Sequence, residues 1–159
     1  RFRGAFAGVE GDASALLAGE RLAERLGMTA VRIPAGAKAA YHAGATIVAN
    51  YTVALMGMAV RLARSAGVPA ELAGKTYLPP PHAAAENLHR LAPQDALTGA
   101  IRRGDAGTVA AHLAALAPGD RRLYAVVGLE ALALSRQTGL AEGAAAQLER
   151  LLTDAATGR

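Results

Sequence analysis

An uncharged, mostly apolar stretch from Ala39 to Val60 constrains the fold of this chain more than any other feature. It reads AAYHAGATIVANYTVALMGMAV and lies between Lys38 and Arg61. A span of about 20 residues suffices to cross a bilayer. This stretch, however, contains His42, two tyrosines and only a few large aliphatic side chains. Its composition therefore predicts one long helix buried inside a globular protein, with no membrane as a partner.

Three polar residues are evenly spaced along this stretch. His42, Thr46 and Asn50 are four positions apart, so on an α-helix they lie along one face, about one turn from each other. Burying an imidazole and a carboxamide costs about a few kcal/mol unless each finds a hydrogen-bond partner. Two interpretations follow: the three side chains are satisfied core residues, or they hold a ligand.

Composition narrows the class of protein. At 159 residues the chain is one domain of ordinary size, and its 52% hydrophobic and 4% aromatic content predicts a core of Ala, Leu and Val. The net charge of +4 comes from scattered arginines without interleaved aromatics, which argues against a nucleic-acid partner. The absence of cysteine excludes disulfides and thiolate chemistry, and the four histidines show no metal-ligand spacing, so we expect no metal.

The start of the chain predicts that it is a fragment of a longer protein. The first residue is not Met, and Arg1-Phe2-Arg3 reads as the approach to a strand. No secretory signal is recognisable, so we expect a cytoplasmic protein.

The first 35 residues predict a strand–helix–strand unit. Ala5 to Gly11 is a short apolar run, Asp12 offers a helix N-cap, Gly27 ends the helix, and the second strand MTAVRIP stops at Pro34. A crossover of this length suits parallel strands. Since two strands make a poor sheet, we expect them to belong to a larger one.

The remainder is predicted to be helical, which makes the fold class mainly α. We expect residues 36–159 to form a helical bundle around the one long buried helix. The pattern predicts a loop from Pro93 to Gly104 and helices over residues 38–66, 70–77, 82–91, 105–116, 120–136 and 140–152.

The segments GAFAGVEGD, KAAYHAGATIVANYTVAL and ALTGAIRRGDAGTVAAHLAAL resemble the C-terminal part of a bacterial two-domain family. That family is described as Rossmann-like NADP oxidoreductases with a C-terminal domain of unknown function. It is 6-phosphogluconate dehydrogenase C-terminal-like and similar in plan to ketopantoate and pyrroline-carboxylate reductases. The resemblance runs from about Phe2 to the penultimate helix; the family usually has Pro where this chain has Ala100.

The resemblance implies different roles for two parts of the chain. Residues 1–35 would be the end of a Rossmann-like domain, and residues 36–159 a helical substrate-binding and dimerisation domain that pairs as a homodimer. NADP or NAD would be bound mainly by a domain absent from this chain, since no G-x-G-x-x-G follows a strand here. The fragment alone would therefore be inactive. The rival interpretation is a non-enzymatic helical binding or dimerisation module.

The resemblance also implies roles for the polar row. His42 or Lys38 would supply a proton to the substrate, a small oxo acid or imine, as hydride arrives. Thr46 and Asn50 would hydrogen-bond the substrate. An imidazole titrates near neutral pH, which suits the first role.

The loop before Asp105 has two interpretations. In the structural one, Gly99 and Gly104 permit turns and Asp105 caps the next helix. In the functional one, four of its residues lie at the substrate cleft, with one of the arginines binding a substrate carboxylate or a cofactor phosphate. These candidate substrate-binding residues are Thr98, Gly99, Arg102 and Arg103.

Overall fold

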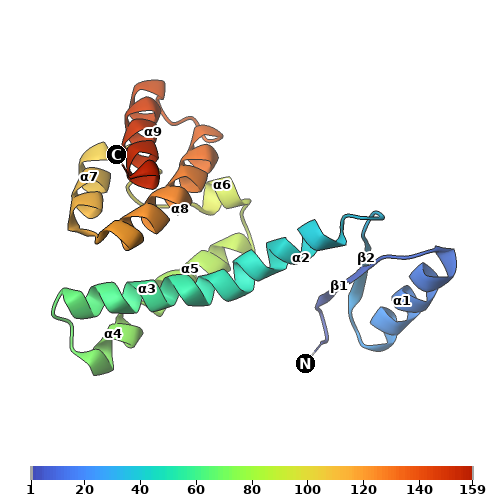
Figure 1. Ribbon diagram of the computed structural model, residues 1–159. Helices are drawn as coiled ribbons and strands as arrows, with labels where there is room; N and C mark the ends of the chain where they lie inside the picture. The colour runs from blue at the N-terminus through green and yellow to red at the C-terminus, as the bar shows by residue number, and fades with distance from the viewer. Residues whose placement is uncertain (1, 159) are drawn as a thin grey trace. The chain divides into compact units, whose positions relative to one another are not determined.

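The computed structural model describes residues 2–158 and shows a mainly α protein with one small parallel sheet (Figure 1). The predicted mainly α fold class is therefore confirmed. The chain divides into two compact units, Arg1–Ala59 and Val60–Arg159. The domain boundary predicted between residues 35 and 36 stays a prediction.

The first unit begins with the predicted strand–helix–strand motif. Strands β1 (Phe6–Val9) and β2 (Thr29–Arg32) are parallel, with Phe6 opposite Thr29. Helix α1 (Ala13–Arg25) connects them. A Cβ atom at Gly19 of α1 would lie 2.9 Å from Cγ1 of Val9. Glycine therefore lets α1 pack closely on β1.

The long helix follows in three parts: α2 (Lys38–Thr46), the π-helical turn η1 (Ile47–Tyr51) and α3 (Thr52–Ser65). In a π turn the backbone bonds run from residue i to i+5, and such turns are frequent at functional sites. The Thr52 hydroxyl donates to the Val48 carbonyl at 2.8 Å, which gives that carbonyl a partner at the end of the π turn.

The predicted burial of this helix is not borne out. It is the one helix among the described residues that is long and apolar enough to cross a membrane, yet only 6% of its most apolar window is buried. Val48 is 72% and Val53 71% exposed. The reason is geometric. A helix from residue 38 to 65 is about 40 Å long, and within the first unit only two short strands and α1 are available to cover it.

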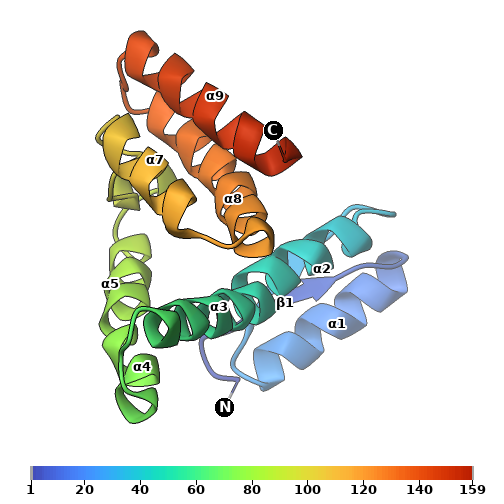
Figure 2. The same ribbon diagram turned by 60° about the vertical axis from the view of Figure 1, so that its left-hand side comes forward.

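The core of the second unit lies elsewhere, between its last three helices. These are α7 (Ala106–Ala115), α8 (Pro118–Arg136) and α9 (Glu142–Thr157), which lie together in both views (Figure 1, Figure 2). Their buried side chains form one apolar cluster that includes Val109, Leu132, Leu148 and Leu152. The bundle is therefore built around α8 and α9, and not around the long helix.

Shorter helices link α3 to this bundle: α4 (Ala70–Thr76), α5 (Pro79–Leu88) and α6 (Pro93–Ala96). Helix α5 starts at Pro79, three residues before the predicted start. Proline is tolerated in the first turn of a helix, where its missing N–H has no partner to lose. Helix α9 extends past the predicted end to Thr157, and the following Gly158, with a φ of 78°, terminates it.

Candidate functional site

The polar row of the long helix lies on the first unit, mostly at its surface. Lys38 is the first residue of α2, His42 and Thr46 follow on the same helix, and Asn50 lies in η1. Lys38, His42 and Asn50 are exposed and Thr46 is partly buried. Because η1 is π-helical, the four-residue spacing keeps its α-helical geometry only as far as Thr46.

These side chains do not behave as satisfied core residues. Within residues 2–158, no side-chain hydrogen bond or salt bridge involves His42, Thr46 or Asn50. Their polar groups therefore remain available to a ligand or to another chain. The structural interpretation of the row expected partners inside the fold, and the described residues provide none of the side-chain bonds that it expected.

The second candidate group lies in the loop between α6 and α7, in the second unit. The loop closes on itself through bonds from the Arg103 N–H to the Gly99 carbonyl (3.2 Å) and from the Asp105 N–H to the Ala100 carbonyl (2.9 Å). Gly99 has a φ of 96°, a left-handed conformation that favours glycine. A Cβ at Gly104 would lie 2.9 Å from that of Ala144, so this glycine allows the loop to approach α9.

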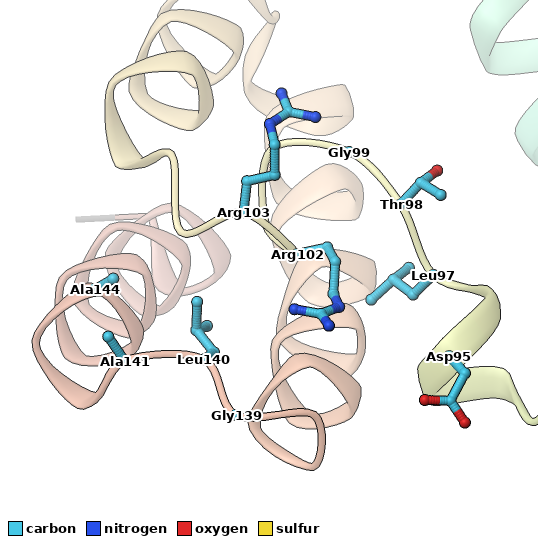
Figure 3. A pocket seen from close by; sticks show the side chains of 10 residues that line it. All are labelled: Asp95, Leu97, Thr98, Gly99, Arg102, Arg103, Gly139, Leu140, Ala141 and Ala144. Carbon is cyan, nitrogen blue, oxygen red and sulfur yellow. The ribbon is translucent and has the colours of Figure 1, made fainter.

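This loop forms one wall of an open cleft of about 730 Å³ (Figure 3). The opposite wall is the segment that joins α8 to α9. All four candidate residues of the loop line the cleft, together with residues that the sequence did not single out. The lining residues are Asp95, Leu97, Thr98, Gly99, Arg102, Arg103, Gly139, Leu140, Ala141 and Ala144.

The two arginines differ in orientation. Figure 3 shows Arg102 extending into the space between Leu97 and Leu140, whereas Arg103 extends in the opposite direction. Arg102 is partly buried and Arg103 is exposed. Neither guanidinium forms a salt bridge within the described part of the chain. Of the two alternatives left open by the sequence, Arg102 therefore has the geometry to meet an anion inside the cleft.

Asp105 anchors the C-terminal end of the loop. Its carboxylate accepts bonds from the Thr108 N–H (2.9 Å) and the Thr108 hydroxyl (2.6 Å) at the start of α7. These bonds, chiefly that of the hydroxyl, lower the pKa of Asp105, and the charge of Arg103 adds to the effect. The structural interpretation of Gly99, Gly104 and Asp105 is correct, and it is compatible with a functional cleft.

The structure thus brings together Thr98, Gly99, Arg102 and Arg103, while the polar row belongs to the other unit. Sequence reasoning missed the segment from Gly139 to Ala144. Gly139, with a φ of 82°, could have been identified as the end of a helix. No sequence signal paired it with a loop about forty positions earlier.

The strand-to-helix turn of the first unit does not fit the phosphates of a dinucleotide. Such phosphates bind where a helix N-terminus offers free N–H groups. At α1 the Asp12 carboxylate already accepts from the Ala15 N–H at 2.8 Å and from the Ser14 hydroxyl at 2.7 Å. Its negative charge would repel a phosphate there. Nor does any group of three or more acidic or histidine side chains among residues 2–158 have the arrangement to hold a metal ion.

A family model described as "Domain of unknown function (DUF2520)" matches residues 5–131. The match includes the strand–helix–strand motif, the long helix and the loop before α7. No curated protein and no solved structure matches the chain.

Proposed function

The chain belongs to the family described as Domain of unknown function (DUF2520). On that premise we propose that it is the substrate-binding and dimerisation part of an NAD(P)-dependent oxidoreductase that reduces a small oxo acid or imine. The parallel strand–helix–strand motif followed by helices supports the proposal, because it matches the plan of the dehydrogenases that the sequence resembles.

The observation that carries the proposal is the arginine in the cleft of the second unit. A guanidinium without an acidic partner, directed into an open cavity, recognises a carboxylate through charge-assisted hydrogen bonds. Thr98 and Gly99 line the same cleft and would be further contacts of the substrate.

The polar row would supply the proton. The resemblance assigns His42 or Lys38 as the proton donor, and Thr46 and Asn50 as hydrogen-bond partners of the substrate; all of them belong to the first unit. His42 is exposed and has no hydrogen-bond or ion-pair partner in the described part of the chain, so its imidazole is accessible to a bound molecule.

The nicotinamide cofactor would be held outside the described residues. Because Asp12 occupies the N-terminus of α1, the residues present do not fit a dinucleotide, and we derive no step through it. The chain would therefore act only together with a cofactor-binding partner or domain.

The test uses the protein expressed from its gene. NADPH and NADH oxidation is followed with a panel of 2-oxo acids and cyclic imines. We expect turnover by the wild type, and an increase of KM by about tenfold or more in Arg102→Ala, since bonds to charged groups contribute about 1.5–3 kcal/mol. His42→Ala and Asn50→Ala should lower kcat, and Arg103→Ala serves as the matched control.

A wild-type protein that binds neither reduced cofactor would overturn the oxidoreductase proposal. The second candidate, a non-enzymatic dimerisation module, would then stand. It is favoured by the exposed apolar surface of the long helix, which has the properties of an interaction surface.

A further inference from the structure

The second unit contains another cavity, of about 650 Å³, that none of the roles above uses. It lies between the C-terminal end of α3, Tyr77 after α4, the end of α7, and Tyr124 on α8. Its size falls in the range of about 300–1,000 Å³ that is typical of small-molecule sites. Two of the four tyrosines of the chain line it, which concentrates aromatic rings in a protein that has few.

Most of the wall is apolar. Leu62, Ala66, Ala115 and Leu116 contribute aliphatic surface, and no Asp, Glu, Lys or Arg side chain is among the described residues that line the cavity. An ion placed there would lose hydration without gaining a counter-charge from the lining. The wall therefore favours an uncharged occupant with an apolar body.

The polar groups of the cavity centre on one pair. His112 Nδ1 lies 2.9 Å from the Tyr124 Oη, and the two rings meet edge to face with centroids 5.8 Å apart. If Nδ1 carries the proton, it donates to the tyrosine oxygen and leaves the hydroxyl hydrogen free. If Nε2 carries it, the tyrosine donates to Nδ1 and the Nε2–H is free.

Either tautomer therefore leaves one donor without a partner inside the pair. Burial raises the pKa of Tyr124, so its hydroxyl keeps the proton at neutral pH. The hydrogen bond of the pair is exposed, so the unused donor bonds to water until the acceptor atom of a ligand replaces that water, and the neighbouring aromatic rings suit a ligand that carries a ring.

We propose that this cavity, the Tyr124 cavity, binds a small neutral ligand that combines a ring with one hydrogen-bond acceptor such as a carbonyl oxygen. The ring packs against Tyr77 and the aliphatic wall. The acceptor receives the free donor of the His112–Tyr124 pair. The site is separate from the cleft lined by Arg102 and does not depend on the oxidoreductase proposal.

The experiment uses benzamide as the probe, because it is neutral and has a ring and a carbonyl. Binding is followed by the NMR signals of the tyrosine and histidine rings, and by tyrosine fluorescence, which no tryptophan obscures in this chain. We expect saturable binding in the millimolar range or tighter. Benzoate, which has nearly the same shape but a charge, should bind at least about tenfold more weakly.

Two substitutions locate the site. Tyr124→Phe keeps the ring and removes the hydroxyl, and should weaken benzamide binding by about three- to tenfold, the loss expected for one hydrogen bond. Ala115→Leu fills the cavity and should abolish binding. Tyr41→Phe, on α2 and outside the lining, is the matched control and should bind like the wild type.

Circular dichroism establishes that each variant is folded. If Ala115→Leu does not fold, Ala66→Val provides the second cavity-filling test. The proposal is overturned if benzamide does not saturate the wild type, if benzoate binds equally well, or if folded cavity-filling variants and Tyr124→Phe bind benzamide like the wild type.

Discussion

Single aspartates stabilise the starts of α1 and α7 by the same chemistry. The Asp12 carboxylate accepts from the Ala15 N–H, and the Asp105 carboxylate from the Thr108 N–H and hydroxyl. Only the ionised carboxylate accepts these bonds at full strength, so the pKa of each aspartate is lowered in the folded state. Folding is then linked to pH through both residues.

The linkage has a definite sign. A lowered folded-state pKa gives stability that is fully present above the unfolded pKa of about 3.9 and is lost as the pH falls through the folded value. We predict that Asp105→Asn, which keeps an acceptor without the charge, reduces the loss of Tm between about pH 5 and pH 2. Thermal denaturation at several pH values measures this.

Asp105→Ala, which removes both acceptors, should lower Tm at neutral pH more than Asp105→Asn does. Equal pH dependence in the wild type and Asp105→Asn would show that the charge of this residue does not stabilise the fold.

At the scale of elements, the contact between α8 and α9 dominates the second unit. Leu148 and Leu152 are fully buried, and a Cβ on Gly128 of α8 would lie 2.8 Å from Cδ2 of Leu152. Arg136 of α8 also pairs with Glu149 of α9 at 2.8 Å, although both side chains are partly exposed and add little. Apolar packing therefore holds these helices together.

Truncation in this contact should be costly. We predict that Leu148→Ala lowers the free energy of unfolding by about 2–5 kcal/mol, because it leaves a cavity in a closely packed core. Leu123→Ala on α8, where the leucine is 41% exposed, is the control and should cost less than about 1 kcal/mol. Urea denaturation followed by circular dichroism measures both, and similar costs for the two variants would contradict the assigned core.

The elements that the sequence predicted correctly depend on local signals. Asp12 and Gly27 bracket α1, and Asp105 starts α7, because caps and left-handed glycines act within one turn. The π turn η1 has no comparable signature in residues 47–51. The prediction that the long helix is buried was wrong, because apolar composition does not specify what packs against a helix.

The same difference between local and long-range signals applies to the cleft lined by Arg102. The sequence predicted Thr98, Gly99, Arg102 and Arg103 as a group because they are consecutive or nearly so. The opposite wall around Leu140 depends on how α8 and α9 pack, which is a long-range property.

At the scale of the whole molecule, the long helix carries an exposed apolar surface that is suited to contact with a partner. Five large side chains on its η1 and α3 parts are between 39% and 72% exposed: Ile47, Val48, Tyr51, Val53 and Leu55. No charge interrupts residues 39–60, so nothing on this surface selects a charged partner. We propose that a second copy of the chain covers it, as expected for a homodimer.

We predict that the chain is a dimer and that the double variant Val48→Glu, Val53→Glu is a folded monomer, because two buried charges at the contact would oppose association. Sedimentation equilibrium measures the mass. Val126→Glu, at an exposed position on α8, is the control and should remain dimeric. A wild type that is monomeric at high concentration, or that floats with lipid vesicles, would contradict the homodimer.

The most direct test of the account asks whether the cleft lined by Arg102 binds a small oxo acid. Pyruvate is titrated into the isotopically labelled chain, and backbone amide NMR signals are followed. We predict saturable shifts at Gly99, Arg102 and Leu140, their loss in Arg102→Ala, and their retention in Arg103→Ala. Shifts that are absent in the wild type, or that persist unchanged in Arg102→Ala, would contradict the assignment of this cleft as the substrate site.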